Sequence, residues 1–459
     1  MPNNTKNIRD IIHGYIPIRQ QDLQIIDTDI FQRLRRIKQG YVQTVYPCAN
    51  HSRFEHSLGV MYLGTKVIEH LKDQLTTEFG VSEKRYYELY NTVIYACLLH
   101  DIGHAPFSHI GEKFYDKNEI TTILSCQLKE NGIIAELHGE AAEHELCSCA
   151  IALEYFGEML KDQIDLELFC RMITGEAYNK KDKRVEDVII SILNSDFDVD
   201  KLDYCLRDSF MTGAKIVVLD VDRLISSFII KDDKSEGRPV LAFSSKSLST
   251  ISNFVYGREA VYMWIVSHHI TIFTDCIFIR LINHLMEITQ KQNEYFGYDA
   301  ICKDLKDDYD LISFIRHYKK GDAYAEHLYN QLFNRDYYKA LWKNYYEYPS
   351  TEYHSYLSMV SRTKKTKYGN GLEDLIIKKY PIFSKGDFYI ASTDYTKPLA
   401  PLQVKDISIV INGKVEKFEK IFAKTFTKDS KTDIPFIFVK DSKRSELLDI
   451  LTSDKLADL

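Results

Sequence analysis

The sequence is poor in the residues that interrupt helices and in long apolar runs. Only 10 prolines and 20 glycines occur among 459 residues, so long helices can form without breaks. The apolar run Val93–Leu99 falls far short of the roughly 18–20 residues that span a bilayer. The segment Met1–Asp10 is polar and lacks the apolar centre of a secretory signal. We therefore expect a cytoplasmic protein without a membrane segment.

The sequence also lacks a disulfide pattern and an excess of positive charge. It has nine cysteines, an odd number, and no Cys-x-x-Cys pair, which favours buried thiols in a reducing compartment over disulfides or a structural zinc site. With 59 basic and 66 acidic residues, the net charge is −7. Nucleic-acid binding would therefore need a local basic surface, for which the loop predicted at 361–371 is a candidate.

The spacing of apolar residues predicts a mainly α fold with a smaller α+β lobe at the C-terminal end. Helical spacing runs from Thr28 to about Asp208 and again from Ser247 to about Asn344. Residues 216–245 read as one helix followed by a short strand. Near the C-terminal end, "DFYIAST", "ISIVING" and "IPFIFVK" alternate like strands, with a turn at 412–413.

One motif combines several groups that can bind a metal. In "LLHDIGHAPFSH", residues 98–109, we expect a helix that places His100 and His104 on one face, with Asp101 about 100° around it. Pro106 would end that helix, and His109 would turn back over the same site. Burying these groups without partners would cost several kcal/mol. A divalent ion such as Fe, Mn, Zn or Mg would satisfy them together.

Two other histidine-containing segments are weaker candidates. In "ANHSRFEHSLG", His51 and His56 flank Arg53 near the start of a helix. His56 could be a ligand or a packed core histidine, and Arg53 could bind a phosphate or make a surface ion pair. In "GEAAEHELCS", His144 stands at a helix start and carries little information alone.

The segment "NSDFDVDKLDYCLRDSF", residues 194–210, predicts a helix with one polar face. Asp200, Asp203, Tyr204, Arg207 and Asp208 share that face. The face could simply be solvated. The acids that precede it instead favour a carboxylate directed at a cation, because clustered acids repel one another unless positive charge intervenes.

Taken in order, these motifs resemble the HD-domain superfamily of phosphohydrolases. The match is closest to its deoxynucleoside triphosphate triphosphohydrolases, through "DIIHGYIPI", "IIDTDIFQRLRRIKQ", "NHSRFEHSLGV", "LLHDIGHAPFSH" and "DVDKLDYCLRDSFMTG". The resemblance covers about residues 6–290, and we expect no sterile-alpha-motif domain. It implies an HD-domain helical core and metal ligation by His56, His100, Asp101 and Asp200.

The resemblance also implies roles for other residues. His104, His109 and His144 would surround the scissile phosphate, with His109 donating a proton to the leaving 5′-oxygen. Triphosphate and sugar would be held by Gln39, Arg53, Lys201, Tyr204, Asp208 and Arg258. A guanine nucleotide or dNTP activator would bind at an oligomer interface through Lys6, Asp27, Gln32 and Arg35, in a homodimer or homotetramer.

The resemblance implies four regions and one reaction. The regions are an N-terminal segment with the activator site (1–45), the catalytic core (46–215), a helical extension that completes the pocket (216–345) and the α+β lobe (346–459). The reaction is hydrolysis of a deoxynucleoside triphosphate to the deoxynucleoside and tripolyphosphate.

The sequence departs from the family in the sugar pocket and near the activator site. Gln39 is followed directly by Gly40 and a shorter loop, Val266 replaces a tyrosine, and Ser244 replaces a basic residue. These departures leave two alternatives open. One is an HD phosphohydrolase that acts on another nucleotide, such as a ribonucleoside triphosphate or an oligonucleotide end. The other is a nucleotide-sensing protein without catalysis.

Overall fold

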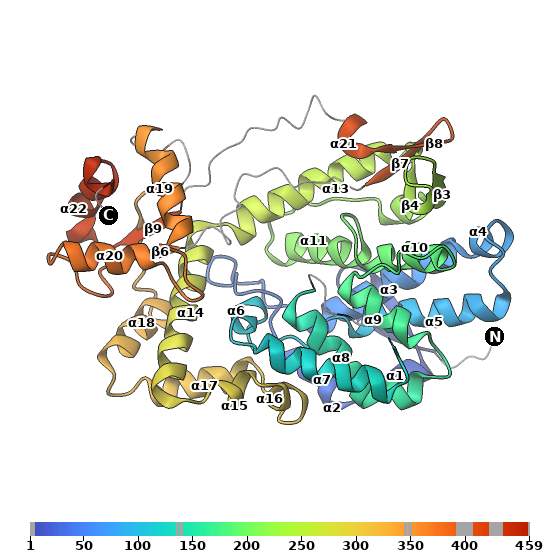
Figure 1. The fold of residues 1–459 in the computed structure, drawn as a ribbon, viewed down its shortest axis with the longest axis horizontal. Helices are drawn as coiled ribbons and strands as arrows, with labels where there is room; N and C mark the ends of the chain where they lie inside the picture. Colours follow the sequence, from blue (N-terminus) through green and yellow to red (C-terminus); the bar gives the residue numbers. More distant parts are fainter. Residues whose placement is uncertain are drawn as a thin grey trace.

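A computed structural model describes residues 5–134, 137, 141–343, 347, 351–391, 407–421 and 435–457. The fold is mainly helical, as predicted. Figure 1 shows a broad helical body that contains α1 to α11, with a smaller lobe around α19, α20 and α22 at the opposite end of the long axis. The long helix α14 (His269–Thr289) links the two parts.

The chain begins with a β-hairpin and two short helices. Strands β1 (Thr5–Asp10) and β2 (Gly14–Arg19) pair antiparallel, and α1 (Gln20–Ile26) follows directly. The Thr28 side chain caps α2 (Asp29–Gln32) by accepting a hydrogen bond from the Phe31 amide.

The helical core consists of nine helices among the described residues. They are α3 (Arg53–His70), α4 (Lys72–Thr77), α5 (Glu83–Leu99), α6 (His109–Glu112), α7 (Lys117–Glu130), α8 (Glu143–Leu160), α9 (Leu166–Thr174), α10 (Arg184–Leu193) and α11 (Val199–Met211). Helix α3 packs against both α5 and α11. Gly59 permits the α3–α11 contact, because a Cβ atom there would lie 2.0 Å from Asp203 Oδ1.

The region after the core differs from its prediction. Residues 216–245 form the short helix α12 (Val221–Ile225) and the hairpin β3 (Phe228–Asp233) and β4 (Arg238–Ser244), where the sequence indicated one helix and one strand. Over so short a segment, a strand that is apolar on both faces has nearly the same apolar spacing as a buried helix, so periodicity alone does not distinguish the two. Next come α13 (Leu248–Val261), a π-helical turn (Tyr262–Val266), α14, α15 (Gln292–Phe296), α16 (Tyr298–Cys302), α17 (Asp308–Tyr318) and α18 (Ala323–Phe333).

The predicted C-terminal strands divide between two sheets. Strands β5 (Lys339–Ala340), β6 (Phe388–Ala391) and β9 (Phe436–Val439) form a sheet in the lobe, in the order β5-β9-β6. The lobe also contains α19 (Thr351–Thr363), α20 (Gly371–Lys379) and α22 (Arg444–Leu451). Helix α19 therefore extends into the segment 361–371, which the sequence indicated as loop throughout.

Strands β7 (Ser408–Ile411) and β8 (Lys414–Lys417) lie outside the lobe. They join the hairpin next to the core in the order β3-β4-β7-β8 and lead into α21 (Phe418–Ile421), as Figure 1 shows. Asn412 and Gly413 have φ values of 50° and 78° at the turn between them, which confirms the turn predicted there. Part of the C-terminal region thus completes a sheet beside the core.

All nine cysteines lie among the described residues and are free, and six of them are buried. No single helix in the described part of the chain has both the length and the hydrophobicity to cross a membrane. One bent pair, Ser245–Val266 with His269–Thr289, meets those criteria only when both helices are counted together.

Candidate metal centre and active-site pocket

Three helices bring the predicted metal ligands together. His56 is on α3, His100 and Asp101 follow the end of α5, and Asp200 is in the first turn of α11. Asp200 Oδ1 lies 2.9 Å from His56 Nε2 and 3.7 Å from His100 Nε2. Asp101 is adjacent, with its oxygens 3.6 Å from His56 Nε2 and 3.3 Å from His100 Nε2. Side chains far apart in the sequence therefore converge on one point.

The prediction that one helix carries His100 and His104 and ends at Pro106 is wrong. Helix α5 ends at Leu99, and His100 to Gly103 form turns, so His100 and His104 do not share a helix face. The helix ends well before Pro106. A Cβ atom on Gly103 would lie 2.4 Å from the Ser148 amide nitrogen, so this segment packs directly on the backbone of α8. The chain therefore turns at residues 100–103, where Gly103 contacts the backbone of α8, and not at Pro106.

The histidines of this cluster are oriented as metal ligands require. His56 Nδ1 donates to Asp203 Oδ2 at 2.8 Å, and His100 Nδ1 donates to the Cys97 carbonyl at 2.8 Å. Both Nε2 atoms are buried and make no hydrogen bond within the described chain. When Nδ1 of a histidine donates to a neighbouring acceptor, the lone pair of Nε2 is free to bind a metal. Imidazole and carboxylate groups together suit a divalent transition ion.

The electrostatics of the cluster also favour a cation. Burial opposes ionisation of Asp200, but the close imidazole rings of His100 and His56 hold its pKa well below the usual value. Burial likewise opposes ionisation of Asp101, and the charge of Arg53 keeps its pKa well below the usual value. Burial lowers the pKa of His56, but the close carboxylates of Asp200 and Asp203 raise it to about 10. Two ionised carboxylates, Asp101 and Asp200, therefore lie beside the imidazole rings.

A buried ionic network behind the cluster was not assigned a role from sequence. Asp203 accepts from His13 Nε2 at 2.6 Å and from Arg207 Nε at 2.9 Å, besides His56. Arg207 also donates to Asp10 at 2.8 Å. Because Asp10 and His13 belong to the N-terminal hairpin, only the folded structure reveals that this hairpin supports a candidate metal ligand.

Arg53 is buried and fixed in place. It donates to Asp101 Oδ2 at 2.8 Å, to Ser108 Oγ at 3.0 Å and to the Gln39 carbonyl at 3.2 Å. Phe107 and Ser108 both have positive φ, 60° and 50°, which is uncommon for residues other than glycine. The Arg53 contact with Ser108 thus ties the metal cluster to the strained turn that precedes His109.

The three predicted catalytic histidines surround one carboxylate, that of Glu112, which the sequence did not single out. His104 and His144 stack with ring centroids 4.1 Å apart. Glu112 bonds to Nδ1 of His104, to Nδ1 of His109 at 3.0 Å and to Nδ1 of His144 at 3.1 Å. These four residues form a second group that could hold a cation. The sequence signal that could have indicated Glu112 is its position in "HIGE", one helical turn after His109.

The histidines of this group differ in charge state. Burial lowers the pKa of His104 to about 4. Burial also opposes protonation of His144, but the charge of Glu112 raises its pKa to about 9. His109 is the exposed member, with 65% of its side chain accessible. At neutral pH the group therefore holds a neutral His104 beside a protonated His144.

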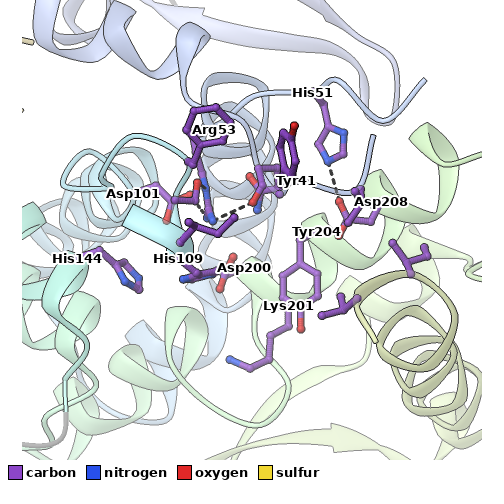
Figure 2. A pocket seen from close by; sticks show the side chains of 18 of the residues that line it. Tyr41, His51, Arg53, Asp101, His109, His144, Asp200, Lys201, Tyr204 and Asp208 are labelled. Atoms are coloured by element: carbon purple, nitrogen blue, oxygen red, sulfur yellow. Dashed lines mark hydrogen bonds and ion pairs between the residues drawn. The ribbon is translucent and has the colours of Figure 1, made fainter. Parts of the chain in front are cut away.

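One cavity of about 510 Å³ contains most of the predicted site. Its lining includes His100, Asp101, Asp200, His109 and His144, together with Gln39, Arg53, Lys201, Tyr204, Asp208 and Arg258. In Figure 2, His109, His144 and Asp200 lie on one side, and Tyr204 and Asp208 on the other. His56 and His104 lie behind the lining. All six residues proposed for substrate binding thus face the same cavity as the metal ligands.

The polar side chains of this cavity are held by defined contacts. Arg258 Nε donates to Tyr204 Oη at 3.2 Å, and Lys201 pairs with Asp198 at 2.5 Å. Asp208 pairs with His51 Nε2 at 2.7 Å. The polar face of α11 is therefore not simply solvated, since Asp203 and Arg207 on the same helix are almost fully buried.

The predicted activator residues lie outside the cavity lining. Lys6 is on β1, Asp27 follows α1, and Arg35 donates to Gln32 at 2.7 Å on the surface. Gln32 also donates to the Ile26 carbonyl at 2.7 Å.

Comparison with known proteins agrees with this geometry. Residues 53–194 match the HD domain. The chain is 29% identical over 402 residues to an uncharacterized protein of Methanocaldococcus jannaschii, covering 86% of this chain and 74% of that protein. It is 31% identical over 269 residues to the deoxynucleoside triphosphate triphosphohydrolase SAMHD1 homolog of Dictyostelium discoideum, covering 58% of this chain but only 47% of that protein.

Two solved structures share the fold. A phosphohydrolase from Bacteroides thetaiotaomicron superposes with a TM-score of 0.63 at 21% identity and covers 95% of this chain and 100% of its own. A hypothetical protein from Aquifex aeolicus gives 0.61 at 22% identity, with 96% and 100% covered. The fold and the His–Asp cluster define an HD-domain protein with a candidate divalent-metal site. The chain therefore contains an HD domain, and it is similar to deoxynucleoside triphosphate triphosphohydrolases over part of their length.

Proposed function

We propose that this protein is a metal-dependent phosphohydrolase that converts a deoxynucleoside triphosphate and water to the deoxynucleoside and tripolyphosphate. The observation that carries the proposal is one cavity lined by members of both histidine groups and by two cations. His100 and Asp200 of the metal cluster, His109 and His144 of the group around Glu112, and the cations Lys201 and Arg258 all line it. A metal centre alone would fit many reactions. The adjacent cations and proton-transfer groups favour a polyphosphate substrate.

Each part of the cavity has a role in this reaction. His56, His100, Asp101 and Asp200 would hold the divalent ion, which supplies Lewis acidity that polarises a phosphate oxygen and acidifies water. Lys201 and Arg258 neutralise charge on the triphosphate. Attack of water oxygen at the α-phosphorus breaks the bond from that phosphorus to the 5′-oxygen.

Proton transfer to the leaving 5′-oxygen falls to His109. It is the exposed member of the histidine group, and Glu112 accepts from its Nδ1 at 3.0 Å, which fixes the ring and leaves Nε2 for the substrate. His144 is held protonated by Glu112 and lines the cavity, so its ring can donate a hydrogen bond to a phosphate oxygen, and the neutral His104 stacks against it.

Product analysis tests this reaction. Purified protein with Mn²⁺ and each of the four dNTPs should release tripolyphosphate and the deoxynucleoside in equal amounts. The double variant His100→Ala/Asp101→Ala should be inactive. Release of orthophosphate or pyrophosphate without tripolyphosphate would exclude attack at the α-phosphorus, and wild-type activity no higher than that of the double variant would favour a sensor without catalysis.

The second candidate is hydrolysis of another nucleotide. Val266, the last residue of the π-helical turn, lines the cavity, and its apolar side chain offers no hydrogen bond to a sugar. Ribonucleoside triphosphates and short oligonucleotides therefore belong in the same panel. Assays with and without GTP, and mass measurement in solution, would test the predicted activator and the predicted homodimer or homotetramer.

A further inference from the structure

Four side chains in the cavity lining present buried polar atoms that make no hydrogen bond within the described chain. They are Gln39 Oε1, His51 Nδ1, His100 Nε2 and Asp275 Oδ1. The proposed function uses His100 for the metal and Gln39 for the sugar, and His51 supports Asp208. It gives no role to Asp275. A buried polar atom without a partner costs about 1–3 kcal/mol, so the carboxyl of Asp275 calls for a ligand.

Asp275 lies on the wall of the cavity formed by α14. Thr271, one helical turn earlier on α14, lines the same wall, and Tyr41, Phe107 and Ile110 add mostly apolar surface. Tyr41 and Phe107 are fixed by edge contacts with ring centroids 5.5 Å apart. This wall is a different part of the fold from α11 and α13, which carry Lys201 and Arg258.

The charged side chains of the cavity indicate which part of a bound nucleotide would lie next to Asp275. A triphosphate is attracted to Lys201 and Arg258, and a carboxyl group is an unfavourable neighbour for it. The nucleoside end is therefore the part that faces the α14 wall. Flat aromatic and apolar surface with one polar side chain is the usual environment of a bound base.

We propose that Asp275 is a substrate-binding residue that pairs with the Watson–Crick edge of the nucleobase. The proposal depends on the proposed function only in requiring that the cavity takes a nucleotide. A protonated carboxyl offers one donor beside one acceptor. Adenine and cytosine present an amino donor beside a ring-nitrogen acceptor, and guanine and thymine present a ring N–H beside a carbonyl. The neutral acid therefore complements all four bases.

The surroundings of Asp275 favour that neutral form. Burial raises its pKa to about 8, against the attraction of Lys113. Tyr41 and Cys276 are the other titratable groups that interact with it, and burial raises the pKa of both. The carboxylate form, which only accepts, would instead pair best with guanine, whose edge presents two adjacent donors. Base preference should therefore shift toward guanine as the pH rises.

Three variants test the role of Asp275. Asp275→Asn keeps a donor beside an acceptor but cannot ionise, and Asp275→Leu keeps the size but loses both. Asp299→Asn removes an exposed acid that pairs only with Lys303 among the described residues, and serves as the matched control. We expect KM for all four dNTPs to rise about 10- to 100-fold in Asp275→Leu, corresponding to one or two lost hydrogen bonds. The control should match the wild type.

The pH dependence gives a second readout. Between about pH 6.5 and about pH 8.5, on either side of the Asp275 value, the ratio of kcat/KM for dGTP to that for dTTP should rise several-fold in the wild type. It should stay flat in Asp275→Asn. A ratio that changes equally in both proteins would overturn the proposal.

Measurements of dNTP binding test the role of Asp275 independently of the proposed reaction. Measurements of Tm distinguish that role from a purely structural one. Asp275→Leu should weaken binding of dNTPs in Ca²⁺, measured by calorimetry, but not binding of inorganic tripolyphosphate. This measurement remains decisive even if no dNTP is hydrolysed, in which case only the proposed function fails. Because Asp275 Oδ1 makes no hydrogen bond within the described chain, replacement of this residue should not lower Tm. A lowered Tm with unchanged dNTP binding would make Asp275 structural and refute the proposal.

Discussion

Asp203 should control the metal affinity of the site although it is not a ligand. It accepts a hydrogen bond from His56 Nδ1 at 2.8 Å, in a fully buried position. In Asp203→Asn, the amide is nearly isosteric but carries no charge. We expect the variant to bind divalent ions about 10- to 100-fold more weakly, as is typical for loss of a carboxylate behind a metal-binding histidine. This range corresponds to about 1.4–2.8 kcal/mol, the value of one charge-assisted hydrogen bond.

The assay is a competition titration of Mn²⁺ or Zn²⁺ against a chromophoric chelator, supported by metal content after purification. Asp10→Asn is the matched control. Asp10 shares Arg207 with Asp203 but does not touch His56, so its replacement disturbs the ionic network and should leave metal affinity within about threefold. If Asp203→Asn folds normally and binds metal as tightly as the wild type, the orientation of His56 by Asp203 is irrelevant and the reasoning is refuted.

Three further predictions concern the histidine group, the α3–α11 contact and the cations. The folded-state pKa of His144 is about 9, above its ordinary value, so the stabilisation that Glu112 provides is fully present below about pH 6.5 and is lost as the pH rises through 9. Glu112→Gln should remove that alkaline loss of stability in urea unfolding curves measured across pH, and an unchanged pH profile would contradict it. Gly59→Ala should lower the free energy of unfolding by about 1–3 kcal/mol and weaken metal binding, because the added methyl group would collide with Asp203. A thermal melt equal to that of the wild type would show that α3 and α11 can separate freely. Lys201→Ala and Arg258→Ala should each raise KM for a nucleoside triphosphate about 10- to 100-fold while leaving deoxynucleoside binding unchanged, and an equal loss for both ligands would place these residues away from the phosphates.

The sequence predicted the composition of the site better than its geometry. The mainly α fold and the strand character of "ISIVING" and "IPFIFVK" were predictable from local periodicity. The convergence of His56, His100 and Asp200 could be expected only from the order of motifs, because local spacing does not show which helices pack together. His13 and Asp10 were not predictable, since their contact with Asp203 and Arg207 joins residues almost 200 positions apart. The split of the C-terminal strands between two sheets likewise depends on long-range pairing, which a strand's own sequence does not specify.

The error at residues 98–109 has a physical explanation that bears on the site itself. On a continuous helix, adjacent residues point about 100° apart, so His100 and Asp101 could not both face one ion closely. Because α5 ends at Leu99, the backbone is free to direct both side chains inward, with His100 Nε2 3.3 Å from Asp101 Oδ1. Gly103 stabilises the turn by packing against α8. Its amide donates to Ser148 Oγ at 2.9 Å, and its carbonyl accepts from the Tyr115 hydroxyl at 2.5 Å. The buried apolar run before His100 thus fixes the end of α5 in the core. His100 and Asp101 can both face the metal site because they lie beyond the end of that helix.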